Sequence, residues 1–166
     1  MSAKRRDSAD LAEHPLDDID HALVRALQAN GRSRVTHLAG EIGLSVPAIT
    51  DRLRRLEHQG VVTGYQAQVD PKRLGYEVCA VIRVAPGGAG VLPTIAEAAA
   101  NSPEVEECVR VTGDDCFIMT VYLKSLDDLE EFLDRFTPYG RTTTSIVHSR
   151  PVPRRPLPPA PPHRSG

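Results

Sequence analysis

The chain has 166 residues, of which 40% are hydrophobic, 25% charged and only 4% aromatic, and its formal net charge at pH 7 is −2. This balance is typical of a globular protein with one or two small domains, and it excludes a membrane-embedded or wholly disordered chain. Because exposed aromatic rings usually hold single strands by stacking, the low aromatic content also argues against a single-stranded nucleic acid as the ligand.

Residues 1–14 are polar and carry mixed charge, which predicts a flexible arm. They lack an apolar signal core, and no later run is long enough to span a bilayer, so we expect a cytoplasmic protein. From Leu16 to Leu27 apolar residues recur at helical spacing, with aspartates at the start and Asn30-Gly31 at the end. This pattern predicts a supporting helix.

Two further helices are predicted between residues 35 and 58, separated by Gly43, and Ser45 is placed to cap the second. A short turn makes such helices cross steeply, so one face of the second projects away from the core, as in a helix-turn-helix. Small and hydroxyl side chains on this face suit base edges, and arginines can reach phosphates or a guanine. The predicted DNA contacts are Arg34, Ser45, Pro47, Ala48, Thr50, Asp51, Arg52, Arg54 and Arg55.

Gly60 ends the second helix, and a β-branched run toward Val69 predicts an extended wing. We therefore assign residues 15–65 to a winged helix-turn-helix domain and residues 66–76 to a hinge. Two other interpretations stay open, because an arginine-bearing helix is often only a solvated surface and a winged helix can also dock a protein. Acidic and basic residues balance over residues 1–64, so firm DNA binding needs two modules and favours a dimer.

Residues 77–150 show the order βαββαβ, which predicts a ferredoxin-like antiparallel sheet with two helices on one face, and an α+β fold class for the chain. The predicted strands are 78–84, 105–111, 116–123 and 142–149, and the helices are 91–102 and 125–136. The side chains expected to cover the sheet are Leu92, Ile95, Ala96, Ala99, Leu126, Leu129, Phe132, Leu133 and Phe136. The strands are apolar at both alternating positions, so the other sheet face should pack against a second subunit. Residues 151–166 are predicted to be a proline-rich, extended tail.

Signatures of catalysis and of metal binding are missing from the sequence. Cys79, Cys108 and Cys116 are too widely spaced for a zinc or disulfide pattern. The chain contains no phosphate-binding glycine loop, zinc-protease motif or nucleophile elbow. Cys116 with His148 is the one conceivable nucleophile and base. We therefore expect neither an enzyme nor a cofactor.

Four stretches match a known family: LDDIDHALVRALQANGR, LSVPAITDRLRRLEHQGVVTGY, VTGDDCFIMTV and RFTPYGRTTTSIVHS. Through them residues 16–152 resemble the Lrp/AsnC-type, or feast-or-famine, transcriptional regulators. The resemblance implies a sequence-specific regulator that binds double-stranded DNA and responds to an amino acid or related metabolite. It also implies homodimers joined through C-terminal sheets and often assembled into higher oligomers. The alternative is a metabolite-sensing oligomer whose winged helix docks a protein partner.

The resemblance places the effector at the turn after the second strand, formed by Gly113, Asp114, Asp115, Cys116 and Phe117, with Thr142, Thr143 and Thr144 as further contacts. An aspartate suits the ammonium group of a free amino acid, and hydroxyl donors suit its carboxylate. From the residues alone, an acidic turn followed by β-propensity threonines is the favoured interpretation of these stretches, and only the resemblance brings the effector site level with it. Many relatives carry a second acid where this chain has Cys116, so the departure leaves the ligand open.

Overall fold

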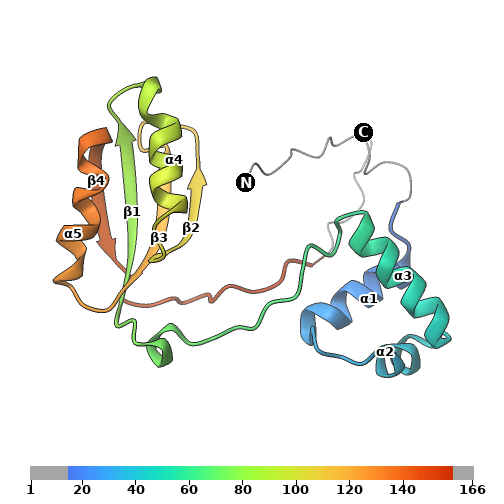
Figure 1. Cartoon of the computed structure of the whole chain (residues 1–166). Coiled ribbons are helices and arrows are strands. Elements are labelled where there is room, and N and C mark those ends of the chain that lie inside the picture. The colour runs from blue at the N-terminus through green and yellow to red at the C-terminus, as the bar shows by residue number, and fades with distance from the viewer. Residues whose placement is uncertain (1–14, 159–166) are drawn as a thin grey trace. The chain divides into compact units, whose positions relative to one another are not determined.

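The computed structural model describes residues 15–158, which belong to two compact units. One unit runs from Gln68 to Pro153, and the other contains the residues before it together with those from Arg154. Figure 1 shows that the first unit in the chain is helical and that the second contains the sheet. The arm predicted at 1–14 and the last part of the predicted tail lie outside the described residues. Within the described part, no helix is both long and apolar enough to cross a membrane.

In its described residues, the helical unit contains three α-helices, namely α1 (Asp18–Ala29), α2 (Val35–Ile42) and α3 (Val46–His58). Their apolar sides share one small core of buried residues: Leu23, Leu38, Ala39, Ile49 and Leu56. Helix α2 ends at Gly43, whose φ of 80° is strained for residues with a β-carbon. Ser45 then caps α3, because its hydroxyl accepts the N–H of Ala48 at 3.4 Å. The predicted helix-turn-helix is confirmed.

The strand predicted after α3 does not form, since residues 61–69 join no β-ladder in the described chain. Gly60 has a φ of 72°, and the N–H groups of Val61 and Val62 both turn back to the carbonyl of Leu56, at 2.9 and 3.1 Å. These bonds close the helix end, and the Val62 side chain packs on the small core. The described residues of the helical unit contain no strand with which residues 61–69 could pair. Their β-propensity alone is therefore not enough to form a β-strand.

The second unit is a four-stranded antiparallel sheet with the order β2-β3-β1-β4. Its strands are β1 (Val78–Pro86), β2 (Val105–Arg110), β3 (Phe117–Leu123) and β4 (Gly140–Ile146). Helices α4 (Leu92–Ala100) and α5 (Asp128–Asp134) lie on the same face of the sheet (Figure 1). Short 3₁₀ turns occupy Pro71–Leu74, Ala89–Val91 and Thr137–Tyr139. The predicted βαββαβ order and ferredoxin-like architecture are confirmed.

The core of the sheet unit lies between the sheet and the two helices. Its buried side chains are Ala80, Ile82, Val84, Ile95, Ala99, Phe117, Met119, Val121, Leu123, Phe132 and Phe136. Two residues expected to cover the sheet are exposed instead. Leu126 precedes α5, which begins only at Asp128, and Ala96 lies on the side of α4 that is turned away from the core. The apolar residues of α4 therefore cover a wider part of the helix surface than the face that packs against the sheet.

The sheet face opposite the helices is half-buried and mixed in character. Apolar residues on it are Cys79, Val81, Ile118 and Tyr122, and polar residues are Arg83, Thr120 and Thr143. The sequence predicts apolar side chains at both alternating positions, whereas the structure interleaves them with an arginine and threonines on this face. A subunit interface here stays a prediction.

Candidate DNA-reading helix and effector turn

Two of the three arginines on α3 are directed at α1. Arg52 Nη1 lies 2.8 Å from Asp17 Oδ2 and 2.7 Å from Asp20 Oδ1, and Arg55 Nη2 lies 2.6 Å from both carboxylate oxygens of Asp20. The Asp20 side chain is only 2% exposed. A buried carboxylate is tolerated when opposite charges and hydrogen bonds surround it, and the two guanidinium groups meet that need. This acid–arginine cluster of Asp17, Asp20, Arg52 and Arg55 therefore ties α3 to α1.

The same aspartates also start α1. Asp17 Oδ1 accepts the N–H of Asp20 at 2.7 Å, and Asp20 Oδ2 accepts the N–H of Asp17 at 3.2 Å, which forms a capping box. The bond from the Asp20 backbone, followed by that from Arg52, holds the pKa of Asp17 below its ordinary value. One pair of carboxylates thus fixes both the first turn of α1 and the direction of α3.

Acid should weaken this cluster in a way that one substitution can reveal. Folding lowers the pKa of Asp17, so its contribution to stability is present above the unfolded value of 3.8 and is lost as pH falls through the folded value. Asp17→Asn keeps a capping acceptor but removes the charge. We expect its melting temperature to fall less than that of the parent between about pH 5 and about pH 2, measured by circular dichroism. Asp18→Asn, an exposed neighbour outside the cluster, should behave like the parent, and equal behaviour of both variants would refute the assignment.

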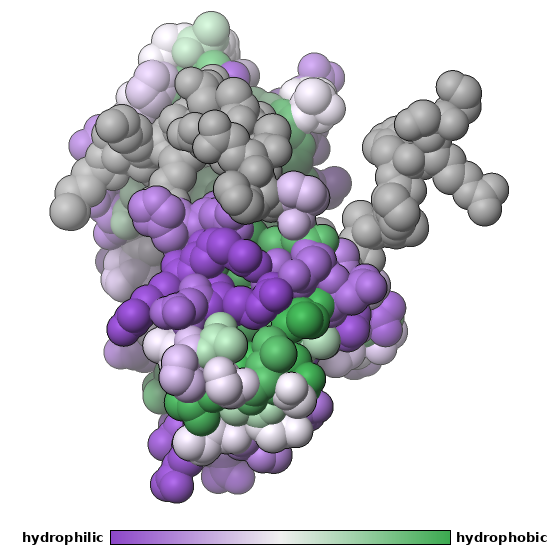
Figure 2. Space-filling view, turned by 90° about the vertical axis from the view of Figure 1, so that its right-hand side faces the viewer, coloured by the Kyte–Doolittle hydropathy of each residue, from purple (hydrophilic) through white to green (hydrophobic). Residues whose placement is uncertain are grey.

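The remaining predicted DNA contacts lie on the open side of the helix-turn-helix. The exposed ones are Arg34, Ser45, Pro47, Asp51 and Arg54, and the half-buried ones are Ala48 and Thr50. Arg54 is 76% exposed, and its nearest carboxylate, on Asp51, is 3.8 Å away. Figure 2 shows a continuous hydrophilic band on the side of the molecule that it draws. Arg54 is therefore the α3 arginine left available for an external partner, whereas Arg52 and Arg55, also predicted as DNA contacts, have partners within the unit.

The predicted effector turn joins β2 to β3. It is closed by the N–H of Cys116 donating to the carbonyl of Asp114 at 2.9 Å, and Gly113 takes a φ of 107°. Asp115 Oδ1 is shielded from solvent and makes no hydrogen bond in the described chain, and its one ionic contact is Arg141 Nη2 at 3.5 Å. Arg141, 73% exposed at the start of β4, was not among the predicted contacts. The turn thus combines an under-satisfied carboxylate with an available guanidinium.

The three threonines do not converge on this turn within one chain. Phe117 at the end of the turn pairs with Val84, and Val84 pairs on its other side with Thr142, so two strand spacings of about 10 Å in total separate them. Thr142 and Thr144 are on the helix side of the sheet, whereas Thr143, paired with Arg83, is on the opposite face. Arg141 at the start of β4 contacts the turn through its ion pair with Asp115.

The conceivable nucleophile and base lie at opposite ends of the sheet. Cys116 precedes β3 at the end where β1 finishes, whereas His148 follows β4 at the end where β1 begins, next to the pairing of Val147 with Cys79. They cannot act together within one chain. In the described residues, no group of three or more His, Cys, Asp or Glu side chains is arranged to hold a metal ion.

Comparisons with known proteins cover both units. Residues 16–57 match the AsnC-type helix-turn-helix domain, and residues 77–157 match the Lrp/AsnC ligand binding domain. The transcriptional regulator LrpA of Mycobacterium tuberculosis is 37% identical over 134 residues, which are 80% of this chain and 89% of LrpA. LrpC of Bacillus subtilis is 30% identical over 81% of this chain and 92% of its own length. A feast or famine regulatory protein from M. tuberculosis, solved with L-methionine, has a TM-score of 0.81 at 35% identity and covers 87% of this chain and 100% of its own.

Proposed function

Because the chain belongs to the Lrp/AsnC family of helix-turn-helix transcriptional regulators, we propose that α3 enters the major groove of DNA and reads its sequence with its exposed residues. Membership makes it a DNA-binding regulator with a ligand-binding domain and not an enzyme. The observation that carries the proposal is the open side of α3, where the first turn presents small side chains and Arg54 follows with only Asp51, at 3.8 Å, beside it.

Two copies are proposed to pair through the sheet face opposite α4 and α5. Pairing would bury the partly exposed side chains of Val81, Ile118 and Tyr122. In a twofold interface of this kind, both subunits contribute the same surface patch. Pairing places two helical units on one DNA duplex, so half-sites should be spaced by one helical turn or a multiple of it. Two modules also offset the lack of net positive charge in the first 64 residues.

The effector proposal rests on opposite charges at one turn. The ammonium group of a free amino acid would satisfy the Oδ1 atom of Asp115, and its carboxylate would accept from Arg141. The α-amino and α-carboxyl groups are common to all amino acids, so Asp115 and Arg141 would select amino acids as a class. Other residues around the turn would determine which amino-acid side chain is accepted. L-methionine is the first ligand to test, because it is bound in a relative that is 35% identical.

Asp115→Asn and Arg141→Gln should each weaken L-methionine binding at least about tenfold, since a hydrogen bond to a charged group contributes about 1.5–3 kcal/mol. Isothermal titration calorimetry measures the loss directly. Asp134→Asn, an exposed acid on α5, is the matched control and should bind like the parent. Unchanged affinity in both turn variants would move the effector site elsewhere.

The function as a whole is tested by titrating the protein against its own upstream DNA and against a shuffled duplex, at two salt concentrations and with or without L-methionine. Tighter binding to the upstream DNA, a steep loss with salt, and a shift on adding the amino acid are expected. Binding that ignores both sequence and salt would overturn the DNA proposal. Specific binding that no amino acid shifts would overturn the effector proposal alone.

A further inference from the structure

The excess of positive charge in this chain lies after residue 138. Residues 139–166 contain five arginines and no acidic residue, whereas residues 1–64 contain nine Lys or Arg side chains and nine Asp or Glu side chains. Within the helical unit, Arg52 and Arg55 are also held by Asp17 and Asp20. The three helices by themselves therefore supply little of the positive charge that binds DNA phosphates.

The first part of this basic stretch belongs to the helical unit. The unit that contains α1, α2 and α3 resumes at Arg154, directly after the sheet unit ends at Pro153. The side chain of Gln28, in the last turn of α1, donates from Nε2 to the carbonyl oxygen of Leu157 at 3.2 Å. Residues 154–158, the basic tail segment, are thus attached to α1 although they lie more than a hundred residues away in the sequence.

The basic tail segment is open to solvent and conformationally restricted. Its five residues are all exposed and join no helix or strand. Arg155 makes no ion pair within the described part of the chain. Pro156 and Pro158 favour an extended polyproline conformation, which reduces the conformational freedom that would be lost on binding. At about 3.1 Å per residue, Arg155 stays within about 10 Å of the bond that attaches Leu157 to α1.

We propose that the basic tail segment is a second DNA contact, in which Arg154 and Arg155 bind backbone phosphates beside the site read by α3. This inference rests on the proposed function, because it requires that the helical unit binds DNA. Guanidinium groups on phosphates position a protein on the duplex without reading its sequence. The segment would therefore add affinity on every duplex and leave the choice of sequence to α3.

Two other roles for the segment make different predictions. The last turn of α1 contains no basic residue, so the two arginines could instead stabilise the negative end of the α1 dipole. A proline-rich segment can also dock in an aromatic groove of another protein. Neither role would change the salt dependence of DNA binding. Attachment to the unit that carries α3 favours DNA as the partner.

Neutralising the segment tests the proposal on the full chain. Arg154→Gln/Arg155→Gln should reduce the slope of log affinity against log salt by about 1.8 for each bound helical unit, since each phosphate contact contributes about 0.9. The advantage of the parent over this variant should then shrink about twelvefold between about 50 and about 200 mM salt. The loss should be equal on the upstream and the shuffled duplex, measured by fluorescence anisotropy. Arg154→Lys/Arg155→Lys should restore the slope, because an ammonium group also neutralises a phosphate.

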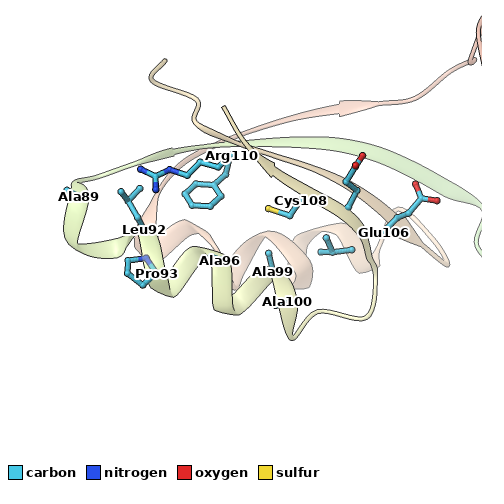
Figure 3. A pocket seen from close by; sticks show the side chains of 12 residues that line it. Ala89, Leu92, Pro93, Ala96, Ala99, Ala100, Glu106, Cys108 and Arg110 are labelled. Carbon is cyan, nitrogen blue, oxygen red and sulfur yellow. The ribbon is translucent and has the colours of Figure 1, made fainter. Parts of the chain in front are cut away.

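A control variant removes two charges from the sheet unit instead. Lys124 is exposed after β3, and Arg110 borders a groove of about 700 Å³ between α4 and β2, with its guanidinium carbon 6.0 Å from the centre of the Phe117 ring (Figure 3). Arg110→Gln/Lys124→Gln has the same net charge as the glutamine variant of the tail and should keep the parental slope. An equal loss of slope in both variants would show an effect of net charge alone and would overturn the proposal.

The remaining outcomes separate this inference from the proposed function. If the parent binds its upstream DNA specifically and the glutamine variant of the tail has the same slope, the second contact is wrong and the reading by α3 stands. A lower melting temperature of that variant at unchanged slope would assign the arginines to the end of α1 and would also overturn the proposal. A parent that binds no DNA would overturn both.

Discussion

Replacement of Asp20 by alanine should lower the free energy of unfolding of the helical unit by about 3 kcal/mol. The change removes the carboxylate that Arg52 and Arg55 share and leaves two guanidinium groups facing α1. We expect the lower end of the cost of breaking a buried ion pair, because these arginines are 23% and 38% exposed and water can reach them. The capping bond from the Asp17 N–H is lost as well.

Urea denaturation followed by helical circular dichroism measures this loss, and Asp18→Ala is the matched control. Asp18 is an exposed acid in the same first turn, so its removal should stay within about 0.5 kcal/mol of the parent. Asp20→Ala should also weaken DNA binding on every sequence alike, because α3 loses its support against α1. A variant as stable as Asp18→Ala would show that the buried charges offset one another without stabilising the unit.

The helix-turn-helix was predictable because its signals are local. Ser45 caps α3 by accepting the N–H of Ala48, three residues later, and Gly43 follows directly on the last residue of α2. The partners of Arg52 and Arg55 were not predictable in the same way, since Asp20 precedes them by 32 and 35 residues. An aspartate near a helix start is expected to face solvent as a dipole partner, and only the crossing of α1 and α3 reveals that Asp20 is buried between them.

In the sheet unit, too, features set by neighbouring residues were predictable, whereas contacts between residues far apart in the sequence were not. Apolar alternation and turn residues predicted the succession of strands and helices along the chain. The contact of Arg141 with Asp115 was not predictable, because it depends on the pairing of β4 with β1 in the folded sheet. The β-branched run at Val61 and Val62 does not form a strand because pairing needs a neighbouring strand, and the described residues of the helical unit contain none. Ala96 failed as a core residue because a small apolar side chain is compatible with either face of a helix.

Arg54→Ala should reduce the free energy of binding to the specific DNA site by about 1–3 kcal/mol if the side chain reaches a base, and should leave stability almost unchanged. Arg54 is 76% exposed, and its contact with Asp51 at 3.8 Å is that of a weak surface pair. Arg52→Ala should show the opposite pattern. It removes a support of α3, so stability should fall and binding should weaken equally on specific and shuffled DNA.

Fluorescence anisotropy titrations on both duplexes at several salt concentrations separate the two roles, with Arg25→Ala on the exposed side of α1 as the control. If Arg54 contacts a phosphate and not a base, its loss should affect both duplexes and reduce the salt slope by about 1. Equal affinity of Arg54→Ala and the parent on every duplex would remove α3 from the interface. A larger loss of sequence preference in Arg52→Ala than in Arg54→Ala would instead mean that DNA draws Arg52 away from Asp17 and Asp20, which makes the acid–arginine cluster part of recognition.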